Sequence, residues 1–269
     1  MNQLDNRSKD LRRLVMKMIE VDGRGHIGPA FSLIEILRVL YDSFLRFDPS
    51  QSMWPNRDRL ILSKGHGCLA LYAILADKGF ISKDELSTFC KPESRLGGHP
   101  EMRKIPGVEA TTGALGHGLS MGVGMALAAK IQSQLHRILV IVGDGEINEG
   151  SVWEAAMSAS KHKLANLTVL IDHNKLQSYG FTHEVLDLSP LPQKWLSFGF
   201  AVEEVDGHNI HDLERLFERL PLVTDRPLAI ICHTIKGKGL SFAEGNPEWH
   251  HKSGLSPEQI SDMYKCLFQ

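Results

Sequence analysis

The sequence predicts an α/β domain built on a mainly parallel sheet with helices on both faces. Short apolar runs alternate with segments whose apolar residues recur at helical spacing, as in strand–helix–strand units. No repeat, low-complexity tract or linker interrupts this alternation. We therefore expect residues 1–269 to form a single domain.

The first part of the chain is predicted to be mostly helical. Helices are expected over residues 4–23, 32–45, 67–80 and 82–89, with one strand over residues 59–63. The first helix should end at Gly23, and Ser32 should cap the second. Ser82 and Glu85 have the spacing of a capping box at the start of the fourth.

A glycine- and proline-rich loop is expected over residues 91–113, and a loop of this length is usually functional. Beyond it the pattern is regular. Helices are expected over residues 115–134, 150–163, 192–198 and 210–220 and in the last twelve residues, with strands over 137–142, 167–172, 200–205 and 228–234. Consecutive strands joined by helices run in the same direction, which favours a parallel sheet.

Composition excludes several classes of protein. Apolar residues make up 42% and charged residues 23%, and the formal net charge is −2, so we expect neither a nucleic-acid nor a membrane partner. No apolar run is long enough to span a bilayer, and the polar N-terminus is unlike a signal peptide. The four cysteines are scattered, as in reduced proteins. We therefore expect a cytoplasmic protein.

Two polar side chains follow neighbouring strands. Asp144 stands in the turn "GDGE" after one apolar run, and Asn174 follows the next run in "LIDHNK". Because carboxyl ends of parallel strands meet at one sheet edge, these side chains should converge. Carboxylate and amide oxygens suit Mg²⁺ or Ca²⁺, and Mg²⁺ commonly completes its shell with phosphate and water. The pair therefore predicts a metal site that binds a phosphorylated cofactor, although Asp and Asn are also common turn residues.

Several motifs in the same order resemble the transketolase family, specifically its N-terminal domain, which binds the diphosphate of thiamine diphosphate. They are "GHIGPAFSLIEIL", "DRLILSKGHG", "LGGHPE", "GVEATTGALGHGLSMGVGMA", "GDGEINEG" with "DHNK", and "GKGLSFAE". The resemblance extends from near residue 10 to the end of the chain. It implies a thiamine diphosphate-dependent enzyme that transfers a two-carbon ketol unit from a ketose phosphate to an aldose phosphate.

The resemblance also implies roles for individual residues. Asp144, Asn174 and the backbone carbonyl of Leu176 would hold Mg²⁺ or Ca²⁺ against the diphosphate. Cofactor contacts are expected from His66, Gly113, Ala114, Leu115, Gly145, Glu149, Asn174 and His250. Glu149 matches a family glutamate that couples paired active sites through a subunit interface, although a carboxylate in a glycine turn is usually only solvated. His117 stands where many relatives carry glutamine.

Three histidines lie among glycines: His26 in "RGHIG", His66 in "KGHG" and His99 in "GGHP". In the family pattern these histidines line the substrate channel, hydrogen-bond sugar hydroxyls and transfer protons. An imidazole suits proton transfer because its pKa lies near neutrality. In "NPEWHHKSG" His250 is the better candidate for a fourth such residue, with His251 as the alternative.

"GRGHIG" also satisfies the dinucleotide-binding pattern G-x-G-x-x-G. That pattern requires a strand before it and a helix opening within it. Here an expected helix precedes the motif and Pro29 follows it, so we reject NAD binding.

In the family, the glutamate that activates the cofactor lies on a second α/β domain. After the expected strand at 228–234 too few residues remain for such a domain. We therefore expect a split enzyme, in which a C-terminal transketolase subunit supplies the pyrimidine-binding domain and the glutamate. The resemblance suggests a heterotetramer with two copies of each subunit. The alternatives are a split transketolase specialised for a branched-chain or sulfonated sugar, a synthase that joins pyruvate to an aldehyde, and a cofactor-binding paralogue without catalytic activity.

Overall fold

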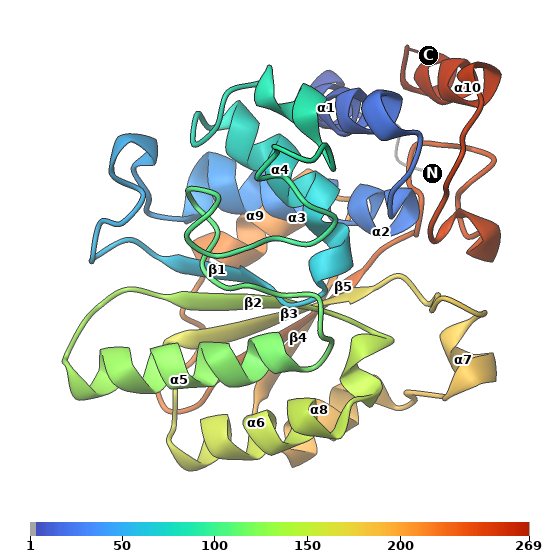
Figure 1. The fold of residues 1–269 in the computed structure, drawn as a ribbon. Coiled ribbons are helices and arrows are strands. Elements are labelled where there is room, and N and C mark those ends of the chain that lie inside the picture. The colour runs from blue at the N-terminus through green and yellow to red at the C-terminus, as the bar shows by residue number, and fades with distance from the viewer. Residues whose placement is uncertain (1–3, 269) are drawn as a thin grey trace.

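A computed structural model describes residues 4–268, which form a five-stranded parallel sheet between two layers of helices (Figure 1). The strand order is β1-β2-β3-β5-β4. The strands are Arg59–Leu62 (β1), Ile138–Gly143 (β2), Leu167–His173 (β3), Ala201–Asp206 (β4) and Leu228–His233 (β5). The predicted α/β class with a parallel sheet is therefore confirmed.

The helices divide between the two sides of the sheet (Figure 1). One side carries α1 (Asn6–Asp22), α2 (Ile27–Phe31), α3 (Ile34–Val39), α4 (Cys68–Asp77) and α9 (Ile210–Glu218). The other carries α5 (His117–Ile131), α6 (Gly150–Lys161) and α8 (Leu191–Ser197), while α7 (Thr182–Val185) and α10 (Pro257–Phe268) lie at the periphery. None of these helices is long and apolar enough to cross a membrane.

Each side of the sheet has its own hydrophobic core, because neighbouring residues of a strand point to opposite faces. In β2, Leu139 and Ile141 pack in the core beneath α1, α3 and α4. Ile138, Val140 and Val142 pack in the core beneath α5 and α6. Every residue of β2 is therefore buried, which explains its unbroken apolar run.

Two local features of the predicted helices are confirmed. Gly23 ends α1 in the left-handed conformation, with φ of 61°, and its N–H donates to the carbonyl oxygen of Ile19. The glycines of α5 let it approach the sheet closely. A Cβ at Gly118 would collide with Ser63 at the end of β1, and one at Gly122 would collide with Val140 of β2.

Two predicted helix starts were wrong. Ser32 does not cap a helix over 32–45: it follows α2, and its hydroxyl donates to Asp172 Oδ2 at 2.6 Å. Helix α3 begins at Ile34 instead and continues directly into a π-helical turn, Leu40–Phe44. At 82–89 only a short 3₁₀ turn, Glu85–Thr88, forms; the Ser82 hydroxyl accepts from the Glu85 N–H at 3.1 Å as predicted, but the Glu85 carboxylate pairs with Arg95 and does not complete the capping box.

The short helices α2 and α7 were not predicted, since each is at most five residues long. The location of α2 also explains the G-x-G-x-x-G match. The helix α1 ends just before the motif and α2 begins at Ile27, so no strand leads into it. The motif therefore lacks the context that a dinucleotide site requires.

Candidate functional site

A cavity of about 300 Å³ lies at the carboxyl ends of β1, β2, β3 and β5. It is the position at which open α/β sheets usually bind their ligands. Ten of the predicted site residues line it: His26, His66, His99, Gly113, Leu115, Asp144, Gly145, Asn174, Leu176 and His250. They come from loops far apart in the sequence, and the sheet brings them to one edge.

Asp144 and Asn174 follow the adjacent strands β2 and β3, as the sequence predicts. The Asp144 carboxylate is 2% exposed and accepts a hydrogen bond from the backbone N–H of Lys175 at 2.5 Å. The Asn174 side-chain oxygen accepts from the N–H of Leu176 at 3.1 Å. The two predicted side-chain ligands are therefore anchored to the same short loop.

The donor chemistry fits a hard divalent cation. One carboxylate, one amide oxygen and one backbone carbonyl are ligand types that Mg²⁺ and Ca²⁺ accept. Among residues 4–268 no three His, Cys, Asp or Glu side chains gather into a metal site. A metal held here would thus need further oxygen ligands, which a diphosphate and water can supply.

The cavity also fits a diphosphate, because glycine backbone forms part of its wall. A Cβ at Gly113 would lie 2.8 Å from the His99 ring, and one at Gly145 would lie 2.9 Å from Cγ of Gln177. No larger residue could stand at either position without displacing a neighbour. Gly113 has φ of 142°, a conformation that favours glycine.

Two buried lysines add positive charge to the cavity. Lys236 Nζ donates to the Leu176 carbonyl oxygen at 2.8 Å, and Lys64 Nζ pairs with Asp172. Burial, together with the nearby Lys64, lowers the pKa of Lys236 to about 7. Two amines beside two glycine-rich turns favour an anionic ligand. Lys64 lies in the quoted motif "DRLILSKGHG" and Lys236 directly precedes "GKGLSFAE", but sequence reasoning assigned neither of them.

Asp172 is a second residue that the sequence analysis missed. Its fully buried carboxylate accepts hydrogen bonds from the amide nitrogen of Asn174 at 3.1 Å, from Ser32, from Thr234 and from Lys64. The nitrogen of Asn174 is thus held against Asp172, and its oxygen, which accepts from the Leu176 N–H, retains a second lone pair for a ligand. Although burial alone would raise the pKa of Asp172, Lys64 and these donors lower it. Its signals in the sequence were its place at the start of the quoted motif "DHNK" and its charge within an apolar strand.

Glu146 was also missed, although it belongs to the quoted "GDGE" turn. Its buried carboxylate accepts from the N–H groups of Gly116 at 2.9 Å and Gly143 at 3.0 Å, and from Ser63. Burial raises its pKa. Glu146 therefore joins the start of α5 to the end of β2, the two segments that carry the glycine walls.

The predicted histidines form one cluster around His26. Its ring centroid lies 5.3 Å from that of His66, 6.2 Å from His99, 5.5 Å from His250 and 4.6 Å from His251. His250 lines the cavity and its Nε2 lies 3.2 Å from the Ser178 hydroxyl, whereas His251 is exposed. This arrangement favours His250 over the alternative, His251.

Burial keeps the cluster neutral at physiological pH. It lowers the pKa of His26 to about 4 and that of His250 to about 3, with nearby histidines and lysines acting in the same direction. The pKa of His66 is also far below its usual value, first through burial and then through Lys64. A neutral imidazole both donates and accepts a hydrogen bond, so the cluster can bind hydroxyl groups and transfer protons.

These lowered pKa values predict acid destabilisation. Unfolded histidine titrates near pH 6.5, whereas His26 stays neutral in the fold down to about pH 4. Protons therefore bind preferentially to the unfolded chain between these values, and the free energy of unfolding falls as the pH falls from 6.5. Replacing His26 with Asn should reduce the stability lost between pH 7.5 and pH 5 by about 1–2 kcal/mol, measured by urea unfolding. His211→Asn, at an exposed position, is the control and should leave the loss unchanged; an equal effect of both variants would contradict the assignment.

Two predicted cofactor residues do not line the cavity. Ala114 is exposed between Gly113 and Leu115, and Glu149 is exposed at the start of α6. Contacts of these two residues with a cofactor therefore remain predictions. The exposed place of Glu149 is compatible with the interface role that the sequence resemblance implies.

Comparison with known proteins agrees with the family resemblance seen in the sequence motifs. The family profile described as "Transketolase, thiamine diphosphate binding domain" matches residues 5–267. The chain is 44% identical over 252 residues to one subunit of the apulose-4-phosphate transketolase of Actinobacillus succinogenes, covering 93% of this chain and 91% of the relative. It is 42% identical over 248 residues to one subunit of the 6-deoxy-6-sulfo-D-fructose transketolase of a Clostridium species, covering 92% and 90% respectively.

Among solved structures, transketolase from Campylobacter jejuni matches with a TM-score of 0.90 and 31% identity. The match covers 100% of this chain and 43% of the Campylobacter chain. The chain thus corresponds in length to the two subunits named above, and to less than half of the Campylobacter polypeptide.

Proposed function

The chain belongs to the transketolase family, and from this premise we propose that it is the N-terminal subunit of a split, thiamine diphosphate-dependent transketolase. The proposed reaction moves a two-carbon ketol unit from a ketose phosphate to an aldose phosphate. The observation that carries the proposal is the meeting of Asp144, Asn174 and the histidine cluster in one cavity. One part of this cavity can bind a metal and a diphosphate, and the neutral imidazoles beside it can form hydrogen bonds with sugar hydroxyl groups.

In the proposed mechanism, Asp144, Asn174 and the Leu176 carbonyl would hold Mg²⁺, or Ca²⁺, together with the diphosphate. When bound, thiamine diphosphate supplies the nucleophilic carbon that carries the ketol unit. Gly113 and Gly145 admit the diphosphate, and Lys64 and Lys236 offset its negative charge. The Asp172 carboxylate binds the amide nitrogen of Asn174, so the amide oxygen would be the atom available to the metal.

The histidine cluster acts on the sugar. His26, His66, His99 and His250 donate hydrogen bonds to its hydroxyl groups and accept them. As neutral bases they also take up the proton that a hydroxyl loses when a carbon–carbon bond is broken, and return it when the new bond forms. Their lowered pKa values keep the imidazoles in the neutral form that can accept a proton, and also make each of them a weaker base than a free imidazole.

The proposed partner is a C-terminal transketolase subunit that brings the pyrimidine-binding domain and the activating glutamate. The length match to subunits of other transketolases supports it. We propose a heterotetramer with two copies of each subunit, working in the cytoplasm. The last point accords with the free thiols at Cys68 and Cys232, whose burial raises their pKa.

A second candidate function is ketol transfer with a specialised sugar as the substrate. The two relatives with identities of 42% and 44% are named for apulose 4-phosphate and 6-deoxy-6-sulfo-D-fructose, whereas identity to the Campylobacter transketolase is 31%. A branched-chain or sulfonated ketose is therefore a candidate donor or acceptor. Comparison of kcat/KM for these sugars with that for xylulose 5-phosphate distinguishes the two candidates.

Reconstitution tests the proposed function. The purified chain with thiamine diphosphate and Mg²⁺ should not transfer ketol units, because the glutamate that activates the cofactor is supplied by its partner. Adding the C-terminal subunit of the same organism should give turnover that saturates at an equimolar ratio. The measurement is product formation followed by coupled enzymes, with the isolated C-terminal subunit as control. Turnover by the chain without its partner would contradict the split arrangement.

A further inference from the structure

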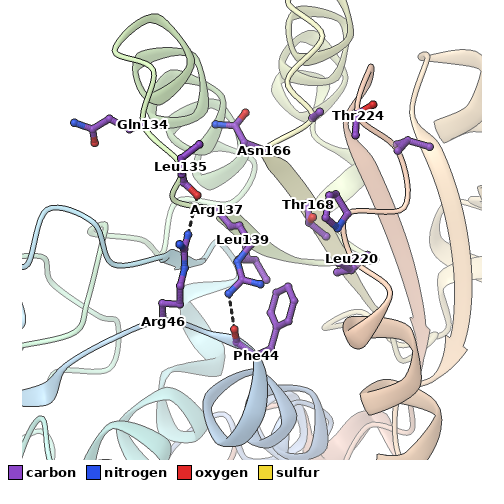
Figure 2. Close-up of a pocket in the computed structure, with 13 residues that line it drawn as sticks. Phe44, Arg46, Gln134, Leu135, Arg137, Leu139, Asn166, Thr168, Leu220 and Thr224 are labelled. Atoms are coloured by element: carbon purple, nitrogen blue, oxygen red, sulfur yellow. Dashed lines mark hydrogen bonds between the residues drawn. The ribbon is translucent and has the colours of Figure 1, made fainter.

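We infer that a second cavity, at the amino edge of the sheet, binds a small organic monoanion: a carboxylate with an apolar or aromatic body. This cavity measures about 550 Å³ and lies where β2, β3 and β5 begin (Figure 2), whereas the histidine cluster lies beyond the carboxyl ends of the strands. Its walls come from four segments, namely those that precede β2, β3 and β5 and the chain that follows the π-helical turn. It shares no residue with the catalytic cavity.

The charge of the cavity comes from Arg46 and Arg137, which one buried carboxylate holds in place. Asp58 Oδ1 accepts from the backbone N–H of Arg137 at 2.8 Å and from Arg46 Nη2 at 2.9 Å. Its Oδ2 accepts from the backbone N–H of Arg46 at 2.8 Å and from Arg137 Nη2 at 2.5 Å. Two guanidinium groups share one carboxylate, so one positive charge remains for a ligand.

The guanidinium groups are also fixed in orientation before any ligand binds. Arg46 Nη2 donates to the Leu135 carbonyl at 2.7 Å, and Arg137 Nη2 donates to the Phe44 carbonyl at 2.5 Å (Figure 2). The Arg137 guanidinium lies 3.8 Å from the centroid of the Phe44 ring. Within residues 4–268 neither Nη1 has a hydrogen-bond partner. Because these side chains are already ordered, an anion can bind them at low entropic cost.

The rest of the cavity is suited to an apolar body. Phe44, Leu139, Leu220, Pro221 and Val223 line it, with Thr168 and Asn166 as polar neighbours. Anions without apolar groups would leave this surface in contact with water. In a carboxylic acid with an aromatic or branched aliphatic group, the carboxylate can pair with the arginines and the apolar group can pack against the apolar wall.

The probe for this site is 3-phenylpropionate, and 3-phenylpropionamide is its neutral match. Titration of the full chain, saturated with thiamine diphosphate and Mg²⁺ in the presence of the partner subunit, should show one saturable site for the acid by ligand-observed NMR. The acid should bind about tenfold more tightly than the amide, since it can form a charge-assisted hydrogen bond. Equal affinity of the two compounds would overturn the inference, and so would loss of binding when the cofactor is added.

Variants locate the binding. Arg46→Met should weaken binding of the acid about tenfold and leave the amide unchanged. Thr224→Trp, at a loop position that lines the cavity, should fill it and weaken both compounds. Arg215→Met removes an exposed arginine outside the cavity and should change neither. Unchanged binding of the acid in Arg46→Met and Thr224→Trp would overturn the assignment to this cavity.

Discussion

Replacing Asp144 with Ala is expected to weaken the Mg²⁺-dependent binding of thiamine diphosphate by about 100-fold or more and to abolish ketol transfer. Asp144 is the only carboxylate in the proposed metal site, and its oxygens also accept hydrogen bonds from Gly145 and Lys175. The variant would leave Asn174 and one carbonyl as protein ligands. Isothermal titration of the complex with its partner subunit measures the change.

Asp84→Ala is the matched control for this experiment, because Asp84 is an exposed aspartate that does not line the cavity. It should bind the cofactor as the native chain does. If Asp144→Ala retained Mg²⁺-dependent binding, the assignment of Asp144 as a metal ligand would be wrong. A paralogue without catalysis could lose cofactor binding and still perform its function, so the assay of ketol transfer is needed beside the titration.

Asp172→Asn is expected to have the second largest effect. The change leaves the buried Lys64 ammonium without its carboxylate, and loss of one partner of a buried ion pair costs about 3–5 kcal/mol. It also places an amide where four groups now donate, so the Asn174 side chain loses its fixed orientation. Urea unfolding should show the lower stability, and titration should show weaker binding of Mg²⁺ and cofactor.

A second substitution separates stability from ligand orientation. In the double variant with Lys64→Met the unpaired charge is gone, so most of the unfolding free energy should return, whereas metal-dependent binding should stay weak because both the Asn174 orientation and the Lys64 charge are lost. Asp206→Asn is the control: this exposed aspartate ends the neighbouring strand β4 and its replacement should change stability by less than about 0.5 kcal/mol. Full recovery of binding in the double variant would show that Asp172 does not orient Asn174.

Most of the fold could be predicted from the sequence because the central strands are buried on both faces. Such strands are unbroken apolar runs, and β2, β3 and β5 were placed within one residue at each end. The convergence of Asp144 and Asn174 was predictable for a related reason: the carboxyl ends of adjacent parallel strands lie at one sheet edge. The glycine-flanked histidines required the resemblance to a family, since no periodic pattern brings their loops together.

Long-range tertiary contacts were not predictable. Ser32 follows a short helix instead of capping a long one because its hydroxyl is bound to Asp172, which is distant in sequence. Asp172 and Lys64 each look like ordinary strand-end residues until the fold pairs them. The amino-edge cavity depends in the same way on Asp58, which joins Arg46 to Arg137 across two separate segments. Local patterns carry no information on such pairs.

The central claim is that oxygen atoms at the ends of β2 and β3 hold a divalent ion that anchors a diphosphate. Calorimetric titration of the native two-subunit complex with thiamine diphosphate, with Mg²⁺ present or with EDTA, tests this most directly. We expect one binding site for each copy of this chain with Mg²⁺, and binding at least about 100-fold weaker with EDTA. Equal affinity under the two conditions would contradict the claim.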